Sequence, residues 1–209
     1  MPNTKEETTV TIAKPNLQQA VFRVYGTAPY VQHKFGAKAR KQMLQAQMST
    51  KGKSRKSKEP RNPEEDYKES QHLTADGKHG IPAPAFRSAM ISACRVAGFV
   101  MTKAKLSVFI IADDLDVDDG TPLVLIKGTP EIHEGSVRLE NGVASLAFRP
   151  MWRTWQADVT VRWDGDQFSQ DDVANLLERA GQQVGIGEGR PDSKKSHGCG
   201  WGTFSLTKQ

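Results

Sequence analysis

The prediction of the fold depends most on the stretch Trp155-Gln-Ala-Asp-Val-Thr-Val-Arg-Trp163. Apolar residues stand at every second position from Trp155 to Trp163, and polar residues stand between them. Successive side chains of an extended chain point to opposite faces, so this alternation predicts a half-buried strand. Both tryptophans lie on its apolar face, and we assign them to the core.

The residues that follow predict an amphipathic helix. Ser169 and Asp172 have the spacing of a capping box, in which the two residues satisfy each other's backbone N–H groups. Gly181 suits the end of this helix, because glycine accepts the left-handed conformation found there. One helix face would carry the apolar residues Val173, Leu176, Leu177 and Ala180.

Upstream, residues 19–26 are rich in β-branched and aromatic residues and predict the first strand. A helix that starts near Pro84 carries an apolar stripe and ends at Gly98. Other elements are expected as a short basic helix at residues 36–48, strands at residues 105–111, 123–127, 137–138 and 144–148, and a last strand at residues 200–206.

This order favours the α+β class, with an antiparallel sheet and two helices on one of its faces. A ferredoxin-like (RRM-like) arrangement accounts for it with the fewest assumptions. Related architectures use the other face, free of helices, to bind single-stranded nucleic acid. We expect a flexible N-terminus at residues 1–18 and a single domain at residues 19–209. A basic insertion of about residues 34–75 would follow the first strand.

The positive charge is concentrated in one block. The chain has a formal net charge of +5, yet ten basic residues and one acidic residue lie between Lys34 and Arg61. A local basic block is typical of a surface that binds nucleic acid or another polyanion. The alternative is a solvated loop that binds nothing, since blocks of like charge are commonly disordered.

A second candidate for anion binding is the loop Val184-Gly-Ile-Gly-Glu-Gly-Arg190. Its glycines would leave backbone N–H groups uncovered, so a phosphate could approach closely, although a simple surface turn is the alternative. The loop follows a helix and precedes a strand, whereas a dinucleotide-binding loop has the reverse order, and the Gly-Lys-Ser/Thr ending of a P-loop is missing. We expect no NAD, no ATP and no other cofactor.

Neither a membrane nor a metal is expected. No run of about 18 apolar residues exists, no signal peptide is recognisable, and two cysteines give no disulfide framework, so we expect a cytoplasmic protein. His197 and Cys199 lack the further ligands of a zinc site. The acidic turn at residues 113–119 lacks the ligand order of an EF-hand.

Three segments carry a resemblance to a known family. Ile81-Pro-Ala-Pro-Ala-Phe-Arg-Ser-Ala-Met90 resembles the start of the first helix of RAMP-superfamily CRISPR proteins, in particular of Cas7-like backbone subunits. Arg149-Pro-Met-Trp-Arg-Thr-Trp155 is similar to the beginning of the second half of that fold. The glycine loop, continued by Gly198-Cys-Gly-Trp-Gly-Thr-Phe204, resembles the glycine-rich loop before its final strand.

The resemblance spans about residues 80–206, and it also extends to small standalone proteins of tailed bacteriophages. It implies a ferredoxin-like fold, binding to a nucleic-acid backbone and head-to-tail assembly along it. The basic insertion fits the place where Cas7-like proteins carry large insertions.

The leading hypothesis is therefore a protein that binds single-stranded RNA or DNA and forms a homo-oligomeric array along it. The proposed phosphate-binding residues are Lys34, Lys38, Arg40, Lys41, Arg87, Arg190, Lys194 and Lys195, beside Gly185, Gly187 and Gly189. The candidates for base stacking are Tyr30, Trp152 and Trp201. Arg149 and Arg153, which flank Trp152, are weaker candidates.

Two alternatives remain open. The first is a RAMP-type endoribonuclease with His33 as the candidate catalytic residue, or else His72, His79 or His197. Binding is favoured over catalysis, because neither paired carboxylates nor histidines at a fixed spacing support an active site. The second is a protein-interaction or inhibitor module, in which the acidic turn faces a partner's basic surface or the Lys34–Arg61 block of a neighbouring copy.

Overall fold

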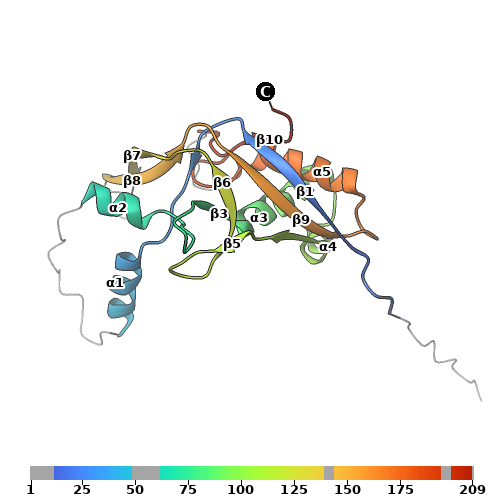
Figure 1. The fold of residues 1–209 in the computed structure, drawn as a ribbon, viewed down its shortest axis with the longest axis horizontal. Helices are drawn as coiled ribbons and strands as arrows, with labels where there is room; N and C mark the ends of the chain where they lie inside the picture. The colour runs from blue at the N-terminus through green and yellow to red at the C-terminus, as the bar shows by residue number, and fades with distance from the viewer. Residues whose placement is uncertain (1–11, 49–61, 139–143, 194–198, 209) are drawn as a thin grey trace, which may run out of the picture.

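The computed structural model describes residues 12–48, 62–138, 144–193 and 199–208. They form an α+β fold with two antiparallel sheets (Figure 1). At the centre of the larger sheet, β1 (Leu17–Gly26) pairs with β9 (Gln156–Asp164) along almost its whole length. The short strand β10 (Phe204–Ser205) pairs with the other edge of β1.

The far edge of β9 is shared by two strands. β4 (Val108–Ile111) pairs with one end of β9 and β6 (Pro122–Lys127) with the other. β6 also pairs with β3 (Gly80–Pro82) and β5 (Asp114–Leu115). The smaller sheet has the order β2 (Tyr30–Val31), β8 (Ala144–Trp152) and β7 (Glu131–Arg138).

The helices are α1 (Ala37–Met48), α2 (Pro63–Glu69), α3 (Ala83–Ala97), α4 (Met101–Ser107) and α5 (Gln170–Arg179). α3 packs against α5, β4 and β6. In the view of Figure 1, β1 and β9 run in front of α3 and α5, and α1 projects from the body. No helix in the described part of the chain is long and apolar enough to span a membrane.

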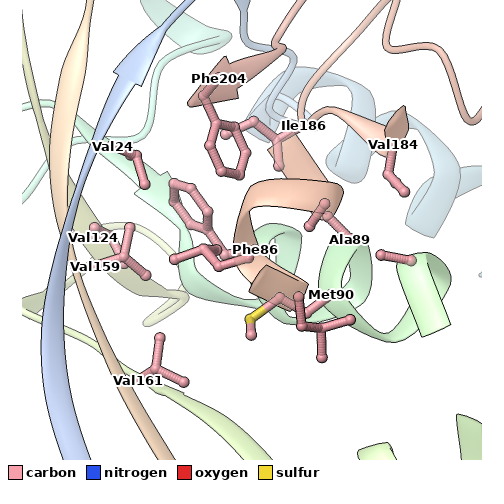
Figure 2. Packing of buried hydrophobic residues seen from close by; sticks show 14 of the residues in the cluster. Val24, Phe86, Ala89, Met90, Val124, Val159, Val161, Val184, Ile186 and Phe204 are labelled. Carbon is pink, nitrogen blue, oxygen red and sulfur yellow. The ribbon is translucent and has the colours of Figure 1, made fainter. Parts of the chain in front are cut away.

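One cluster of buried side chains joins the larger sheet to α3 and α5. The alternation along β9 is confirmed, since Ala157, Val159 and Val161 are fully buried and Trp155 and Trp163 are nearly so. Figure 2 shows Val159 and Val161 facing side chains of α3. Phe204 of β10 reaches the same cluster, with its ring centroid 5.7 Å from that of Phe86. The capping box at Ser169 is also confirmed.

Two predicted element boundaries are wrong. The strand expected at residues 105–111 begins only at Val108, because residues 101–107 form α4, which buries Ala104 in the core. Gly181 does not end the helix after β9: the chain continues as a π-helical turn, η1 (Ala180–Val184), as far as Gly185. A Cβ at Gly181 would overlap the carbonyl oxygen of Phe204, so glycine there lets η1 lie against β10.

Other predicted elements have the right type and different lengths. The last strand is reduced to β10, because Gly200 and Gly202 turn the chain at φ +67° and +66°. β7 and β8 are longer than expected. The basic insertion contains α1 and α2, the second of which Asn62 caps. Its residues 49–61, like residues 1–11 of the N-terminus, lie outside the described residues.

On the face of the sheet that points away from α3, Asp158 links three strands. Its carboxylate accepts hydrogen bonds from Arg23 of β1, at 2.6 Å, and from Lys127 of β6, at 2.7 Å. Hydrogen bonds from these two cations lower the pKa of Asp158 to about 2. The carboxylate therefore stabilises the fold fully above its ordinary pKa, and this contribution is lost as the pH falls toward 2.

Asp158→Asn should flatten the acid limb of the stability curve between pH 4 and pH 2. The expected loss at neutral pH is at most about 1 kcal/mol, since both cations are half-exposed. Urea unfolding at a series of pH values measures the free energy of unfolding of the variant and of the unmodified protein. Arg23→Gln should act in the same direction and by less, because Lys127 remains. An unchanged acid limb in Asp158→Asn would contradict the interpretation.

Candidate functional site

A cleft of about 940 Å³ lies between α3, the smaller sheet and the segment that follows η1. Its walls include Ser88 and Ser92 of α3, and His133 of β7. The floor includes Tyr30 of β2, with Gln32 just after it. The predicted loop glycines Gly185, Gly187 and Gly189, together with Arg190, Trp201 and His33, also line this cleft.

The glycine loop forms one wall by packing tightly on the rest of the chain. Gly185, Gly187 and Gly189 all adopt left-handed φ angles, between +68° and +74°. A Cβ at Gly187 would lie 2.6 Å from both the ring of Tyr30 and the carbonyl oxygen of Val31. A valine at position 187 would therefore disturb the packing of this loop on β2.

The expectation that the glycine loop leaves its backbone N–H groups uncovered is wrong in part. The N–H of Gly185 donates to Ala180, that of Ile186 to Gly202, and that of Glu188 to Val31. Because these donors are bonded within the chain, the loop is a structural wall. These three N–H groups are therefore not free to bind an anion.

Arg190 and Trp201 give this wall its chemistry. Arg190 is partly buried, and its Nη1 donates to the carbonyl oxygen of Gly187 at 2.9 Å, which holds the guanidinium beside the loop. Trp201 is also partly buried and meets the ring of His133 edge-on, with 5.2 Å between centroids. The cleft thus combines a positioned cation with an aromatic ring on one wall.

A partly buried ion pair joins the glycine loop to the smaller sheet. Arg149 of β8 binds Glu188 through Nη1, and its side chain is only 12% exposed. The buried atoms Arg149 Nε and Glu188 Oε2 have no hydrogen-bond partner among the described residues. Partial burial and then the nearby charge of Arg149 lower the pKa of His33, although Glu188 acts in the opposite direction. His33 therefore presents a neutral ring to the cleft at pH 7.

Beneath the cleft lies a network of buried charges. Lys34 Nζ donates to Asp116 Oδ1 and to Asp118 Oδ2, both at 2.6 Å. The other oxygen of Asp116 lies 2.7 Å from Nδ1 of His72, whose ring lines the cleft. The side chains of Lys34 and Asp116 are 4% and 0% exposed. The backbone N–H of His72 donates to Gln32 Oε1, which closes the network.

Opposing effects set the ionisation of this network. Burial alone would raise the pKa of Asp116, but hydrogen bonds from Lys34, the backbone of Asp118 and His72 lower it below its ordinary value. Burial alone would lower the pKa of Lys34, but its two carboxylate partners raise it. Both groups therefore remain charged at neutral pH.

This network corrects one prediction. Lys34 is not a surface cation in reach of a phosphate, because it is buried between two carboxylates. The acidic turn meets basic residues of its own chain: Asp116 and Asp118 bind Lys34, and Asp119 lies 3.4 Å from Arg40.

The same cluster has the spacing of a metal site. Among the described residues, His72, Asp116 and Asp119 place one ligand atom each within 4.8 Å of one another. However, the ammonium of Lys34 already binds Asp116, and the guanidinium of Arg40 pairs with Asp119. Both carboxylates therefore have a cationic partner within the chain.

Several other predicted residues lie away from the cleft or beneath it. Tyr30 and Trp152 are 2% and 0% exposed, with ring centroids 5.5 Å apart, so core packing takes the place of the expected base stacking. Arg87 caps the edge of β4, donating to the carbonyl oxygens of Lys105 and Val108.

The remaining predicted cations belong to two segments. Lys38, Arg40 and Lys41 belong to α1, where Arg40 and Lys41 are exposed and the side chain of Lys38 is not described. Lys194 and Lys195 lie outside the described residues, as does the catalytic alternative His197. His79 lies outside the cleft and meets Trp152 edge-on.

Sequence analysis assigned no role in this cleft to four residues of the region: Gln32, Asp116, His133 and Glu188. Their partners are distant along the chain, as with Lys34 and Asp116, which are separated by 82 positions. If the strand predicted at residues 137–138 had been extended to the full length of β7, His133 would have been placed in a sheet.

Comparison with models of known protein families and with curated proteins finds no match.

Lys34→Met should destabilise the protein by about 3–5 kcal/mol, because it leaves the buried carboxylate of Asp116 without its cation. Lys78→Met is the matched control: Lys78 pairs with Asp76 at 3.6 Å and both side chains are mostly exposed, so less than about 1 kcal/mol should be lost. Chemical unfolding measures both. Equal, small losses would show that the buried network does not hold the fold.

Gly202→Ala and Gly200→Ala form a second matched pair. Both positions require a left-handed backbone, which costs alanine about 1 kcal/mol. Only at Gly202 would the new Cβ overlap the backbone of Ile186, which adds about 1–3 kcal/mol; at Gly200 it meets no described atom within 4 Å. Thermal unfolding should therefore separate the two variants, and equal melting temperatures would contradict the close packing at Gly202.

Proposed function

We propose that this protein binds single-stranded nucleic acid in the cleft. One observation carries the proposal: the glycine loop, Arg190, Trp201 and three histidines line one cavity of about 940 Å³. The histidines are His33, His72 and His133. A cavity of this volume is at the upper end of the range of small-ligand sites. It has room for a nucleotide unit of a strand.

The side chains of the cleft fit the parts of a nucleotide. Arg190 presents a guanidinium group, a group that binds phosphate oxygens in a bidentate manner, whereas the guanidinium of Arg149 is paired with Glu188. Trp201 offers a partly exposed ring, and base stacking on such rings tolerates any sequence. Ser88 and Ser92 add hydroxyl groups from α3. The exposed cations of α1 would extend the contact along the strand.

The proposal includes a ferredoxin-like core. The antiparallel order β10, β1, β9 and β4, with α3 and α5 in one core cluster, supports this arrangement. It also includes head-to-tail assembly along the strand, for which the resemblance to Cas7-like proteins is the only support. The sheet face that points away from α3 is the competing surface, where Val21, Arg23 and Arg162 are exposed.

Arg190→Gln should weaken the binding of a labelled 20-mer about tenfold, as the loss of one charged hydrogen bond predicts. Arg162→Gln on the competing sheet face should leave the affinity unchanged. For the unmodified protein, affinity should fall on the order of 10³-fold between 50 and 200 mM salt if about six phosphates are held. Fluorescence polarisation measures all three.

The reverse pattern, with a loss only in Arg162→Gln, would move the site to the sheet face. A flat salt response or no binding would overturn the proposal. Light scattering of the same samples tests assembly: the mass of the complex should grow with strand length, whereas one protein per strand at every length would exclude an array.

A further inference from the structure

His72 lines the cleft, and the buried charge network dictates the orientation of its ring. Its side chain is 10% exposed, and its Nδ1 lies 2.7 Å from a carboxylate oxygen of Asp116. An ionised carboxylate accepts hydrogen bonds and donates none. Since Lys34 keeps Asp116 ionised, the proton shared by this pair belongs to Nδ1 of the histidine.

The position of this proton determines what the ring offers to a ligand. A neutral imidazole has one N–H group, so the second nitrogen, Nε2, bears a lone pair and accepts a hydrogen bond. Nε2 makes no hydrogen bond to the described residues, and the ring lines the cleft. A phosphate diester carries no hydrogen that Nε2 could accept. For a neutral ring, the partner that fits His72 is therefore a hydroxyl or N–H group of the ligand.

Building on the proposed function, we propose that His72 accepts a hydrogen bond from the ribose 2′-hydroxyl, so that the cleft prefers RNA strands to DNA strands. Among the donors of a strand, the 2′-hydroxyl is present on every nucleotide, whereas the N–H groups of the bases change with sequence. Arg190, which lines the same cleft, suits a phosphate, so a strand held there would bring its sugars into the cleft that His72 also lines.

Changing the sugar of the ligand tests this inference while the protein stays unmodified. We would compare labelled U20 RNA, the deoxyuridine strand dU20 and 2′-O-methyl U20 at pH 7.5, so that base and length stay constant. RNA should bind roughly 3- to 10-fold more tightly than dU20, as one neutral hydrogen bond predicts. The 2′-O-methyl strand, which lacks the donor hydrogen, should bind like dU20.

Variants then assign the preference to His72. His72→Leu should lower RNA affinity to the level of dU20 and leave dU20 affinity unchanged. Asp116→Asn should also reduce the ratio, because an amide can donate to Nδ1 and turn Nε2 into a donor, which makes Asp116 a positioning residue. His79→Leu, a histidine outside the cleft, is the matched control and should keep the unmodified ratio.

The outcomes separate the two proposals. If neither strand binds, the proposed function is wrong. If all three strands bind equally, the protein binds nucleic acid and the role of His72 is wrong. A preference that depends on the base and not on the sugar, or one that persists in a folded His72→Leu variant, would also overturn it. A His72 with a purely structural role would weaken RNA and DNA binding by the same factor.

Discussion

The buried ammonium group of Lys34 is the interaction on which the site depends. It joins three segments that are distant in sequence: the residues after β2, the loop after β5, and the approach to β3 through His72. Removing charges from water costs several kcal/mol for each ion, which only close partners offset. Such a network tolerates few alternative arrangements, so it fixes the floor of the cleft in one geometry.

The opposite wall of the cleft is the glycine loop, and close packing of its backbone determines its shape. Glycines in left-handed conformations let the loop after η1 approach Tyr30 and Trp201 more closely than any other residue would. The chain thus surrounds the cleft with backbone that is bonded to itself. A ligand in the cleft would meet positioned side chains, and little ordering of the protein would be needed for it to bind.

Much of the fold can be predicted from local patterns. The alternation of β9, the capping box of α5 and the apolar stripe of α3 each depend on neighbours within a few residues. The candidate site is harder to predict. Lys34 lies at the start of a basic run, where a solvated charge is the ordinary expectation, and nothing near it reveals the carboxylate of Asp116. The loop glycines were recognised, but their role depends on Tyr30, Val31 and Trp201, which no local pattern places beside them.

The pairing of β1 with β9 has a consequence for how the chain folds. These central strands join residues that lie 135 positions apart, as in the pair Arg23 and Asp158. Contacts of such long range form slowly, since a long loop must close before they are gained. During synthesis, β1 therefore remains an unpaired strand, with Val21 and Phe22 exposed, until β9 has left the ribosome. An unpaired strand edge of this kind is prone to aggregation.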